Sequence, residues 1–397
     1  MTRATRGMLL LACDRFQSGG ATLSDTYRRY RAIKQGIMQF YQPRPTGHRE
    51  KHLNTLVAMI CGLSGGKHAH LPTIADHAPS NGASQESIIK RFRRFLQHDT
   101  NTLSGWFLPI AQQLLNSLAH NPIQLIMDGS VVGRGCLALM VSVVYHGRAL
   151  PLYWVVVSAP KGQFPEDTHR SLLAQVQQIM PKDATVVFLG DGEFDGTHLQ
   201  ADLCRSGWQY VCRTASTILI SACGVRFHVG DLGPPRGELR AVSPAWMTAQ
   251  QYGPISVLAL WEQQYQEPIY LITNMSDLDE AVAQYKKRGH IETFFSDQKS
   301  RGFHIQKSHL SDPARVNRLL IASCLAYLWI VYLGVCAIAP EWMKQLHRQD
   351  RCDLSLFRLG LRLLSRALKE HIPIPDGFLV PAMLPSSLIR TFNKQAA

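Results

Sequence analysis

The spacing of apolar and polar positions changes twice along the 397 residues of the chain. From His52 to His120, apolar residues recur with the period of a helix. From residue 121 to 213, short runs rich in Val, Ile and Leu alternate with turns, which is typical of strands. Residues 214–275 are rich in Gly, Pro, Thr, Val and Ile and predict several more short strands, and from residue 285 the pattern is helical again. The sequence therefore predicts an α/β protein.

These changes of period divide the chain into five expected regions. They are a helical, basic region (1–120), the first part of an α/β core (121–213), a β-rich insertion (214–275), the second part of the core (276–345), and a C-terminal helical region with a tail (346–397). Residues 270–274, Tyr-Leu-Ile-Thr-Asn, are expected to end the insertion by returning to the sheet of the core. The first 25 or so residues are expected to be weakly structured.

The first part of the core predicts a specific order of elements. Strands are expected at Ile123–Asp128, Cys136–Tyr145 and Leu150–Val157, and their short connections imply an antiparallel meander. A helix, a buried strand ending at Asp191, a second helix and a fifth strand, 208–213, follow. This order is that of a ribonuclease H-like core, with a mixed five-stranded sheet and helices.

Two acids fall at notable places in this order. Asp128 ends the first strand and Asp191 ends the fourth. A carboxylate on a buried strand costs several kcal/mol unless it is paired or bound to a metal. Each could instead be a turn or capping acid. Glu193 and Asp195 lie in the same loop as Asp191, which we prefer because it ends the strand.

A third acid lies in the stretch from Tyr285 to Lys299, which contains no proline and predicts a single helix of about four turns. At about 100° per residue, Tyr285, Arg288, Glu292 and Lys299 fall within an arc of about 60°. A carboxylate can hold a divalent metal ion, while cations and a phenol can hold a phosphate. Alternatively, this is a solvated face on which Arg288 and Glu292 form an intrahelical ion pair.

Charge favours a polyanionic partner. The formal net charge is +13, and residues 1–120 contribute +9 of it, from 15 Lys or Arg against 6 Asp or Glu. A helix beginning near Ser84 carries Lys90, Arg91, Arg93 and Arg94 away from its apolar stripe. Such a helix suits DNA phosphates, although a basic solvated face would look the same.

Other features narrow the class. None of the nine cysteines forms a Cys-x2-Cys pair or a zinc-binding spacing, which fits a reducing cytoplasm. Leu319–Ala339 has no charged residue over 21 positions and is long enough to span a bilayer. We favour a buried helix of a large core, and therefore no membrane association, because no second span exists and the helix expected just before it, over residues 285–299, would need covering.

The spacing Tyr285-x2-Arg288-x3-Glu292-x6-Lys299, preceded by Asp128 and Asp191, resembles the signature of transposases of insertion-sequence family four. The resemblance covers roughly residues 85–340 and is most specific at Tyr285–Lys299. These are cut-and-paste enzymes with an Asp-Asp-Glu triad on a ribonuclease H-like core. One departure is Gly192, where the family often has a basic residue after the second aspartate.

The resemblance implies the roles of the residues. Asp128, Asp191 and Glu292 would hold two Mg²⁺ ions, with Mn²⁺ able to substitute. Tyr285, Arg288 and Lys299 would bind phosphates near the transposon end, and the helix of Lys90 to Arg94 lies in the region that grips that end. Trp261 would receive a base flipped out during hairpin formation, unless it is a core tryptophan of the insertion; Trp246 is the next choice.

The expected partners are double-stranded DNA, as transposon ends and as target, and a second copy of the chain in a homodimer. Cleavage would release 3′-hydroxyl ends that join to target DNA. Two other functions remain open on the sequence. One is a ribonuclease H-like nuclease or resolvase without strand transfer, and the other is a basic DNA-binding or membrane-anchored protein without catalysis.

Overall fold

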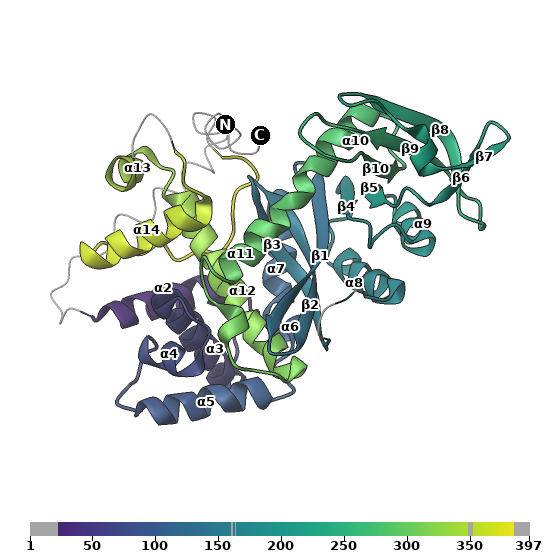
Figure 1. Ribbon diagram of the computed structural model, residues 1–397. Helices are drawn as coiled ribbons and strands as arrows, with labels where there is room; N and C mark the ends of the chain where they lie inside the picture. Colours follow the sequence, from purple (N-terminus) through teal and green to yellow (C-terminus); the bar gives the residue numbers. More distant parts are fainter. Residues whose placement is uncertain (1–22, 160–161, 163, 348–351, 385–397) are drawn as a thin grey trace. The chain divides into compact units, whose positions relative to one another are not determined.

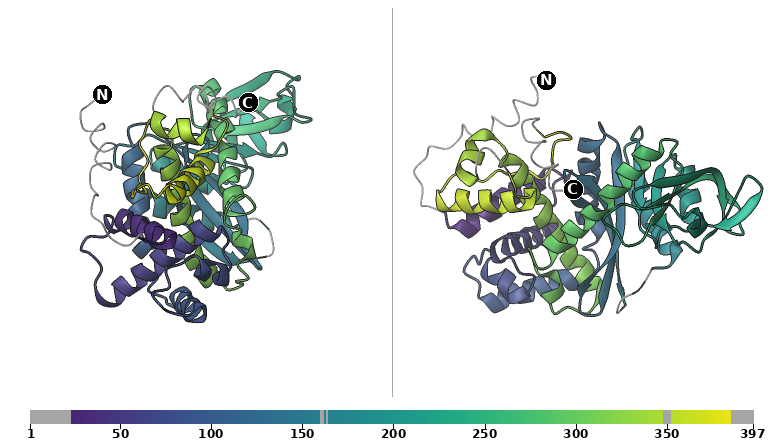
Figure 2. Two further views of the ribbon diagram at one scale, coloured as in Figure 1. Left: turned by 90° about the vertical axis from the view of Figure 1, so that its left-hand side faces the viewer. Right: turned by 45° about the horizontal axis from the view of Figure 1, so that its top comes forward.

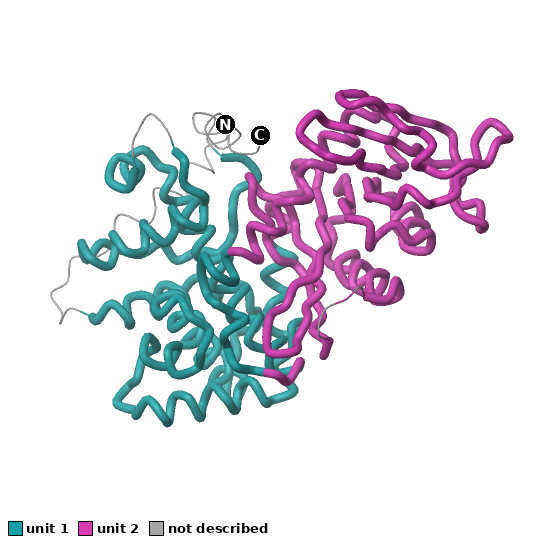
Figure 3. The backbone as a smooth tube through the Cα atoms, viewed as in Figure 1, with its two compact units in different colours: residues 1–113, 297–310, 314–397 teal, residues 114–296, 311–313 magenta. Residues whose placement is uncertain are grey.

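A computed structural model describes residues 23–159, 162, 164–347 and 352–384 of the chain (Figure 1). The expectation for the first 25 residues lies almost entirely outside this range. The chain forms two compact units (Figure 3). Unit 1 comprises residues 1–113, 297–310 and 314–397, and unit 2 comprises residues 114–296 and 311–313.

Unit 2 is built on one sheet of ten strands in the order β3-β2-β1-β4-β5-β10-β9-β8-β6-β7. Its first five strands are β1 (Ile123–Gly133), β2 (Cys136–Tyr145), β3 (Arg148–Ser158), β4 (Val186–Gly190) and β5 (Gln209–Thr214). The first three pair antiparallel, and β4 lies parallel to both β1 and β5. The expected antiparallel meander and the expected parallel strands are therefore both present. Short turns join strands that pair antiparallel, whereas the intervening helices allow strands to pair parallel.

The remaining strands extend this sheet instead of leaving it. They are β6 (Leu219–Ala222), β7 (Val225–His228), β8 (Leu239–Met247), β9 (Tyr252–Leu260) and β10 (Ile269–Thr273), with a 3₁₀ turn η1 (Val229–Leu232). Strand β10 pairs antiparallel with β5, as expected for the return of the chain, and also with β9. Figure 2 shows the inserted strands continuing the sheet of unit 2 in two further views. The sheet thus has ten strands, where the sequence suggested five and a separate insertion.

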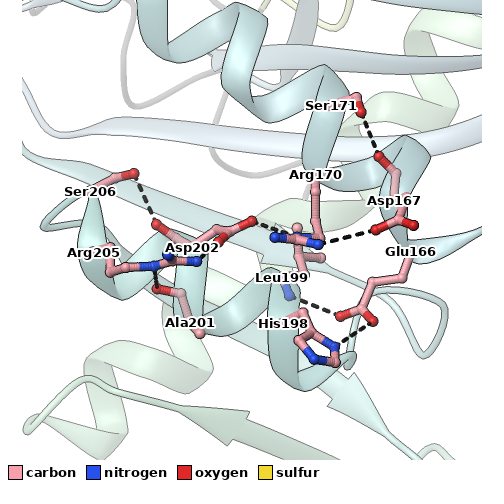
Figure 4. Close-up of polar contacts among 10 residues, drawn as sticks. All are labelled: Glu166, Asp167, Arg170, Ser171, His198, Leu199, Ala201, Asp202, Arg205 and Ser206. Atoms are coloured by element: carbon pink, nitrogen blue, oxygen red, sulfur yellow. Dashed lines mark hydrogen bonds and ion pairs between the residues drawn. The ribbon is translucent and has the colours of Figure 1, made fainter.

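Helices α8 (Glu166–Gln178) and α9 (Thr197–Arg205) are joined by a network of polar contacts (Figure 4). Glu166 accepts hydrogen bonds from the Leu199 backbone N–H at 2.8 Å and from His198 at 3.3 Å. Arg170 donates to Asp202 at 2.6 Å. A Cβ on Gly196, the residue before α9, would lie 2.2 Å from the Glu166 carboxylate, so a larger residue there would displace that carboxylate from its hydrogen bonds. The network fixes the start of α9 and hence the loop that follows β4.

The stretch predicted as one helix is three pieces. It consists of α10 (Leu278–Tyr285), a 3₁₀ turn η2 (Lys286–Gly289) and α11 (His290–Gln298). The prediction of uniform α-helical spacing across Tyr285–Lys299 was therefore wrong, and Lys299 lies in the turn after α11. Gly289 disfavours a helix interior by about 1 kcal/mol. Within η2, Lys286 forms a 2.5 Å ion pair with Glu262.

Unit 1 is helical in its described part. Its helices include α2 (Asp25–Met38), α3 (Gly47–Gly66), α4 (Leu71–Asp76), α5 (Gln85–Gln97), α6 (Leu103–Trp106), the beginning of α7 (Leu108–Leu118), α12 (Pro313–Cys336), α13 (Pro340–Leu346) and α14 (Leu356–Lys369), with a 3₁₀ turn η3 (Ile305–Lys307). Arg28 of α2 donates to the carbonyls of Ala367, in the last turn of α14, at 2.9 Å and of Ile372, just beyond that helix, at 2.6 Å.

Helix α12 is the apolar stretch that could have spanned a membrane. By length and hydropathy it would suffice, but 83% of its most apolar window is buried inside the structure. Its backbone meets that of α14 closely: a Cβ on Gly334 would lie 1.9 Å from the Leu356 carbonyl oxygen, and one on Gly360 would lie 1.8 Å from that of Ile330. The burial is that of a core helix, as favoured from the sequence.

Candidate active site

Asp128 and Asp191 are brought together by the pairing of β1 with β4. The printed register of these parallel strands ends with Ile126 opposite Leu189. Asp128 and Asp191 each follow two residues later, so they lie at the same level on neighbouring strands about 4.8 Å apart. Asp128 does not end its strand as predicted, because β1 runs on to Gly133 and Asp128 lies within it opposite Met140 of β2, whereas Asp191 directly follows β4. Two carboxylates separated by 63 residues in the sequence are therefore neighbours at the point where β4 ends.

The carboxyl group of Asp128 is partly buried and strongly perturbed. Burial is the main cause that raises its pKa, to about 6, and the negative charges of Asp191 and Glu292 raise it further. A hydrogen bond of 2.7 Å from the Gly129 N–H and the charge of Arg288 act in the opposite direction. The electrostatic influence of both other acids on Asp128 shows that all three face a common region of unit 2.

Three acids lie in the loop after β4, and their contacts separate them. Glu193 accepts hydrogen bonds from the Phe164 N–H at 2.6 Å and from the His169 ring at 3.2 Å. Asp195 accepts one from the Thr214 hydroxyl at 2.7 Å. Asp191 accepts a hydrogen bond from the Glu193 backbone N–H at 3.1 Å with one carboxylate oxygen, and its other oxygen lies 3.5 Å from Arg288, which also contacts Glu292. The other two acids are thus occupied by structural contacts, which favours Asp191 as the second acid of the site.

Arg288 contacts two of the three acids. Its guanidinium lies 3.5 Å from the Asp191 carboxylate and 3.9 Å from that of Glu292. The Glu292 side chain is 68% exposed, whereas that of Arg288 is only 21% exposed. One cation therefore neutralises part of the repulsion between carboxylates that converge from β4 and α11.

The donor set suits a hard divalent cation. Among the described residues, no group of three or more His, Cys, Asp or Glu side chains is arranged to hold a metal ion as the side chains stand. Three carboxylates with a partly buried member nevertheless offer the oxygen ligands that Mg²⁺ and Mn²⁺ prefer. Burial, and after it the charges of Asp191 and Glu292, raise the pKa of Asp128 and so disfavour its ionised form, which a bound cation would favour.

Tyr285 and Arg213 lie near Arg288, the cation that contacts the acids. Burial raises the pKa of the Tyr285 phenol, and the positive charges of Arg288 and Arg213 act against that rise. Arg213 is an exposed residue of β5, with buried neighbours on both sides in the strand. Sequence reasoning missed it as a site residue. The signal that could have found it is a lone cation near the end of an otherwise buried strand beside the Asp191 strand.

Trp261 lies just after β9, in the turn toward β10. Its indole N–H donates to the Tyr265 carbonyl at 3.0 Å, and the Arg236 guanidinium stacks over its ring at 5.3 Å. The next residue, Glu262, pairs with Lys286 of η2, the turn that also carries Arg288. Trp261 is only partly buried, and the ion pair of its neighbour Glu262 connects this turn to η2. Trp246 lies instead within β8, opposite Ser221 of β6.

The other predicted DNA-binding residues belong to unit 1. Ser84 caps α5, as the sequence indicated, by accepting a hydrogen bond from the Ser87 N–H. Lys90 pairs with Glu86 at 2.9 Å, and Arg91 lies against the Phe92 ring, whereas Arg93 and Arg94 are exposed. Lys299 also belongs to unit 1, while Asp128, Asp191 and Glu292 belong to unit 2.

Comparisons with known proteins bear on this arrangement. The search of curated proteins gives no match. Among solved structures, the chain is similar to a piggyBac transposase synaptic complex with hairpin DNA, with a TM-score of 0.45 and 10% identity over 94% of this chain and 85% of that one. It is also similar to human ENDOV, with a TM-score of 0.24 and 15% identity over 56% of this chain and 96% of that one. Neither score is high enough to support an argument.

The comparison with protein families is decisive. Residues 127–329 match the family described as "Transposase DDE domain". This match spans just over half of the chain and includes Asp128, Asp191, Arg288 and Glu292. The chain belongs to the transposase DDE domain family and is a DDE transposase.

Proposed function

We propose that this transposase mobilises a bacterial insertion sequence of family four by a cut-and-paste route, binding the terminal inverted repeats, cleaving the ends and joining them to target DNA. The observation that carries the proposal is that Asp191 directly follows β4, beside Asp128 on the adjacent parallel strand β1, with Arg288 in contact with both Asp191 and Glu292. The five strands β1 to β5 have the order of a ribonuclease H-like core, which supports the same conclusion.

The three acids would hold the catalytic metal. Asp128, Asp191 and Glu292 would bind two Mg²⁺ ions, for which Mn²⁺ can substitute, with Asp128 between the other two acids. When bound, such ions activate the attacking oxygen and stabilise the leaving oxygen of a phosphodiester. Arg288 would then be released from its carboxylate partners to bind a phosphate, for which a planar guanidinium is well suited.

The cations around the acids would position the DNA strand. Tyr285, Arg288 and Arg213 would hold phosphates beside the scissile bond, and Lys299 would bind a phosphate near the transposon end. Trp261 would receive a base flipped from the stack if the second strand is cut through a hairpin, because an aromatic ring can replace the lost stacking. For this, the Arg236 guanidinium would have to leave the ring face or share it with the base.

The cations of α5 would contribute to holding the transposon end. Lys90, Arg91, Arg93 and Arg94 would contact phosphates, which fix register without reading sequence. Two copies of the chain would pair two ends in the DNA complex. The protein would act in the cytoplasm, where a bacterial chromosome is accessible.

Substitution of Glu292 by Gln tests the catalytic assignment. The variant keeps the size of the side chain but loses the metal-binding charge, and we expect at least a hundredfold loss of cleavage of a duplex that carries the terminal repeat, as removal of an essential catalytic group typically gives. Glu341→Gln, an exposed position of α13, is the matched control and should cleave like the wild type. Full cleavage by Glu292→Gln would refute the proposal.

A second assay separates transposition from simple nuclease activity. The wild type is given a pre-cut end with a free 3′-hydroxyl, together with target DNA and Mg²⁺. A transposase joins the two molecules, and joint products are resolved on a denaturing gel. Cleavage of intact ends without any joining would instead assign a nuclease or resolvase.

A further inference from the structure

Four histidines from two distant segments meet in unit 1. His68 and His70 lie between α3 and α4, and His304 and His309 flank η3. The rings of His68 and His304 are stacked at 5.3 Å, and those of His70 and His309 lie edge to face at 5.1 Å. His68 and His70 are themselves 6.3 Å apart. The four imidazoles thus form one continuous cluster, which we call the histidine cluster.

The cluster is held in place by unusual backbone geometry. His304 and His309 have left-handed φ angles of 51° and 62°, which residues other than glycine seldom adopt. The His304 N–H donates to the Lys299 carbonyl at 2.9 Å, so the chain turns back immediately after Lys299. The histidine cluster is therefore adjacent, within unit 1, to a lysine that we assign to a DNA phosphate.

The polar groups of the cluster are only partly satisfied internally. His68 uses Nδ1 to accept a hydrogen bond from the His70 N–H at 3.1 Å. Nδ1 of His304 is buried and has no hydrogen-bond partner in the structure. His309 and Lys307 are exposed, so the cluster reaches the surface. A ligand approaching there would meet several N–H donors and one buried nitrogen that lacks a partner.

The charges around the cluster have one sign when it is protonated. His68 is faced by His70 on the α4 side and by His304, Lys307 and His309 on the η3 side, and Lys67 precedes it. Burial and these four groups lower the pKa of His68. Without an anion His68 therefore resists protonation, and an anion bound beside it would reverse that preference. Protonated imidazoles carry positive charge and donate N–H groups, so the ligand that fits the protonated cluster is an anion.

We propose that the histidine cluster, together with Lys307, is a proton-dependent binding site for DNA backbone phosphates. Phosphate oxygens would accept hydrogen bonds from protonated imidazoles, and proton uptake would accompany binding. The proposal rests on the proposed function, because it takes the ligand to be the DNA that the transposase cleaves. The histidine cluster adds to the proposed function a second DNA-binding site, which lies outside the signature residues of Tyr285–Lys299 and has an affinity that depends on pH.

The test measures DNA affinity against pH without any cleavage. The full chain in EDTA is titrated into a fluorescein-labelled duplex of arbitrary sequence at pH 8 and pH 6, at fixed ionic strength. An arbitrary sequence suffices because phosphate contacts carry no sequence information. For the wild type we expect binding to tighten by about tenfold or more on acidification, since each coupled proton can contribute up to a factor of ten per pH unit.

The informative variant is His304→Asn combined with His309→Asn. Asparagine tolerates the left-handed backbone, so the fold is retained while two imidazoles are lost. We expect its affinity at pH 8 to match the wild type within about twofold, and most of the tightening at pH 6 to disappear, because phosphate contacts gain strength only from protonated rings. His371→Asn is the matched control, since His371 is exposed and also has a left-handed φ, of 53°; it should behave like the wild type.

Unchanged pH dependence in the double variant would overturn the proposal. A dependence that EDTA removes and Zn²⁺ restores would also overturn it, in favour of a metal site. Lys307→Gln gives an independent measure, because it should lower the slope of log affinity against log salt by about one without altering the fold. Failure of the proposed function would show differently, as a wild-type protein that does not cleave terminal repeats with Mg²⁺ whatever its affinity at pH 6.

Discussion

At the scale of single residues, the site is defined by which side chains already have partners. The loop after β4 offers three acids, and hydrogen bonds to Glu193 and Asp195 leave Asp191 facing Arg288. The ionised form of Asp128 is disfavoured, because burial and two like charges raise its pKa to about 6. A strained carboxylate of this kind is typical of a site built for a charged ligand.

Asp128→Asn is expected to stabilise the metal-free protein at neutral pH. The folded-state pKa of Asp128 lies above its ordinary value of 3.8, so its contribution to stability is complete below about pH 4 and is lost as pH rises through about 6. Asparagine removes the repulsion and can still accept the Gly129 hydrogen bond. In EDTA at pH 7.5, we expect a gain of roughly 1–3 kcal/mol in the free energy of unfolding, discounted for partial exposure.

Urea denaturation at pH 7.5 and pH 5 measures this effect. The difference between variant and wild type should shrink at pH 5, where the wild-type carboxyl is largely protonated. Mg²⁺ should stabilise the wild type and leave Asp128→Asn unaffected, because the ion binds through the lost carboxylate. An equal response of both proteins to pH and to Mg²⁺ would contradict the assignment of Asp128.

Arg213→Ala is expected to lower the affinity for DNA and the rate of cleavage without lowering the stability of the fold. The side chain is exposed on β5, so the free energy of unfolding should change by less than about 0.5 kcal/mol. Loss of one phosphate contact should reduce the slope of log affinity against log salt by about one and lower cleavage. Arg213→Lys should recover part of the affinity, and Arg226→Ala, an exposed strand residue in β7, serves as control.

At the scale of elements, close backbone approaches decide how the helices of unit 1 pack. Gly334 and Gly360 each face a carbonyl oxygen of the opposite helix, at a distance no Cβ could occupy. The pattern of apolar residues indicated helices here, but it could not show where two backbones would touch. In unit 2, Gly289 has the opposite role: nothing lies within 4 Å of a Cβ placed there, and it marks the 3₁₀ turn.

Gly360→Ala should destabilise the protein by about 2–4 kcal/mol, because α14 and α12 must separate to admit the methyl group. Gly289→Ala is the matched control and should be neutral or stabilising by up to about 1 kcal/mol. Thermal and urea unfolding of both variants tests this pair. Similar stabilities for the two would mean that the α12–α14 contact is not as close as described.

At the scale of the whole molecule, the excess positive charge and the residues expected to cleave DNA lie in different parts of the chain. The family match shows a DDE transposase, and the excess positive charge is concentrated in residues 1–120. Each described unit contains residues to which we assign DNA contacts. DNA affinity should therefore be separable from catalysis by substitution.

Arg93→Ala combined with Arg94→Ala should lower the affinity for a terminal-repeat duplex and reduce the salt slope by about two, with little change in stability because both residues are exposed. The matched control removes the same charge from α14, by Arg358→Ala with Lys369→Ala. Fluorescence anisotropy at several salt concentrations gives both quantities. An equal loss in the control pair would show diffuse attraction to DNA and no specific role for α5.

The sequence predicted much of this molecule for reasons that act locally. The alternation of apolar residues gave the strands from Ile123 to Arg213 and their order, because short turns and intervening helices restrict how strands can pair. The spacing of Asp128, Asp191, Arg288 and Glu292 indicated the enzyme class, since chemistry constrains residue types more tightly than composition does.

Only the tertiary structure decided what depends on long-range contacts. The ten-strand continuity of the sheet, the break at η2, the arrival of Arg213 beside Tyr285 and the meeting of His68 with His304 all depend on segments far apart in the chain. The choice of Asp191 over its neighbours likewise required the partners of Glu193 and Asp195. Local sequence fixes the period and type of an element, whereas its partners follow from packing free energy summed over the whole fold.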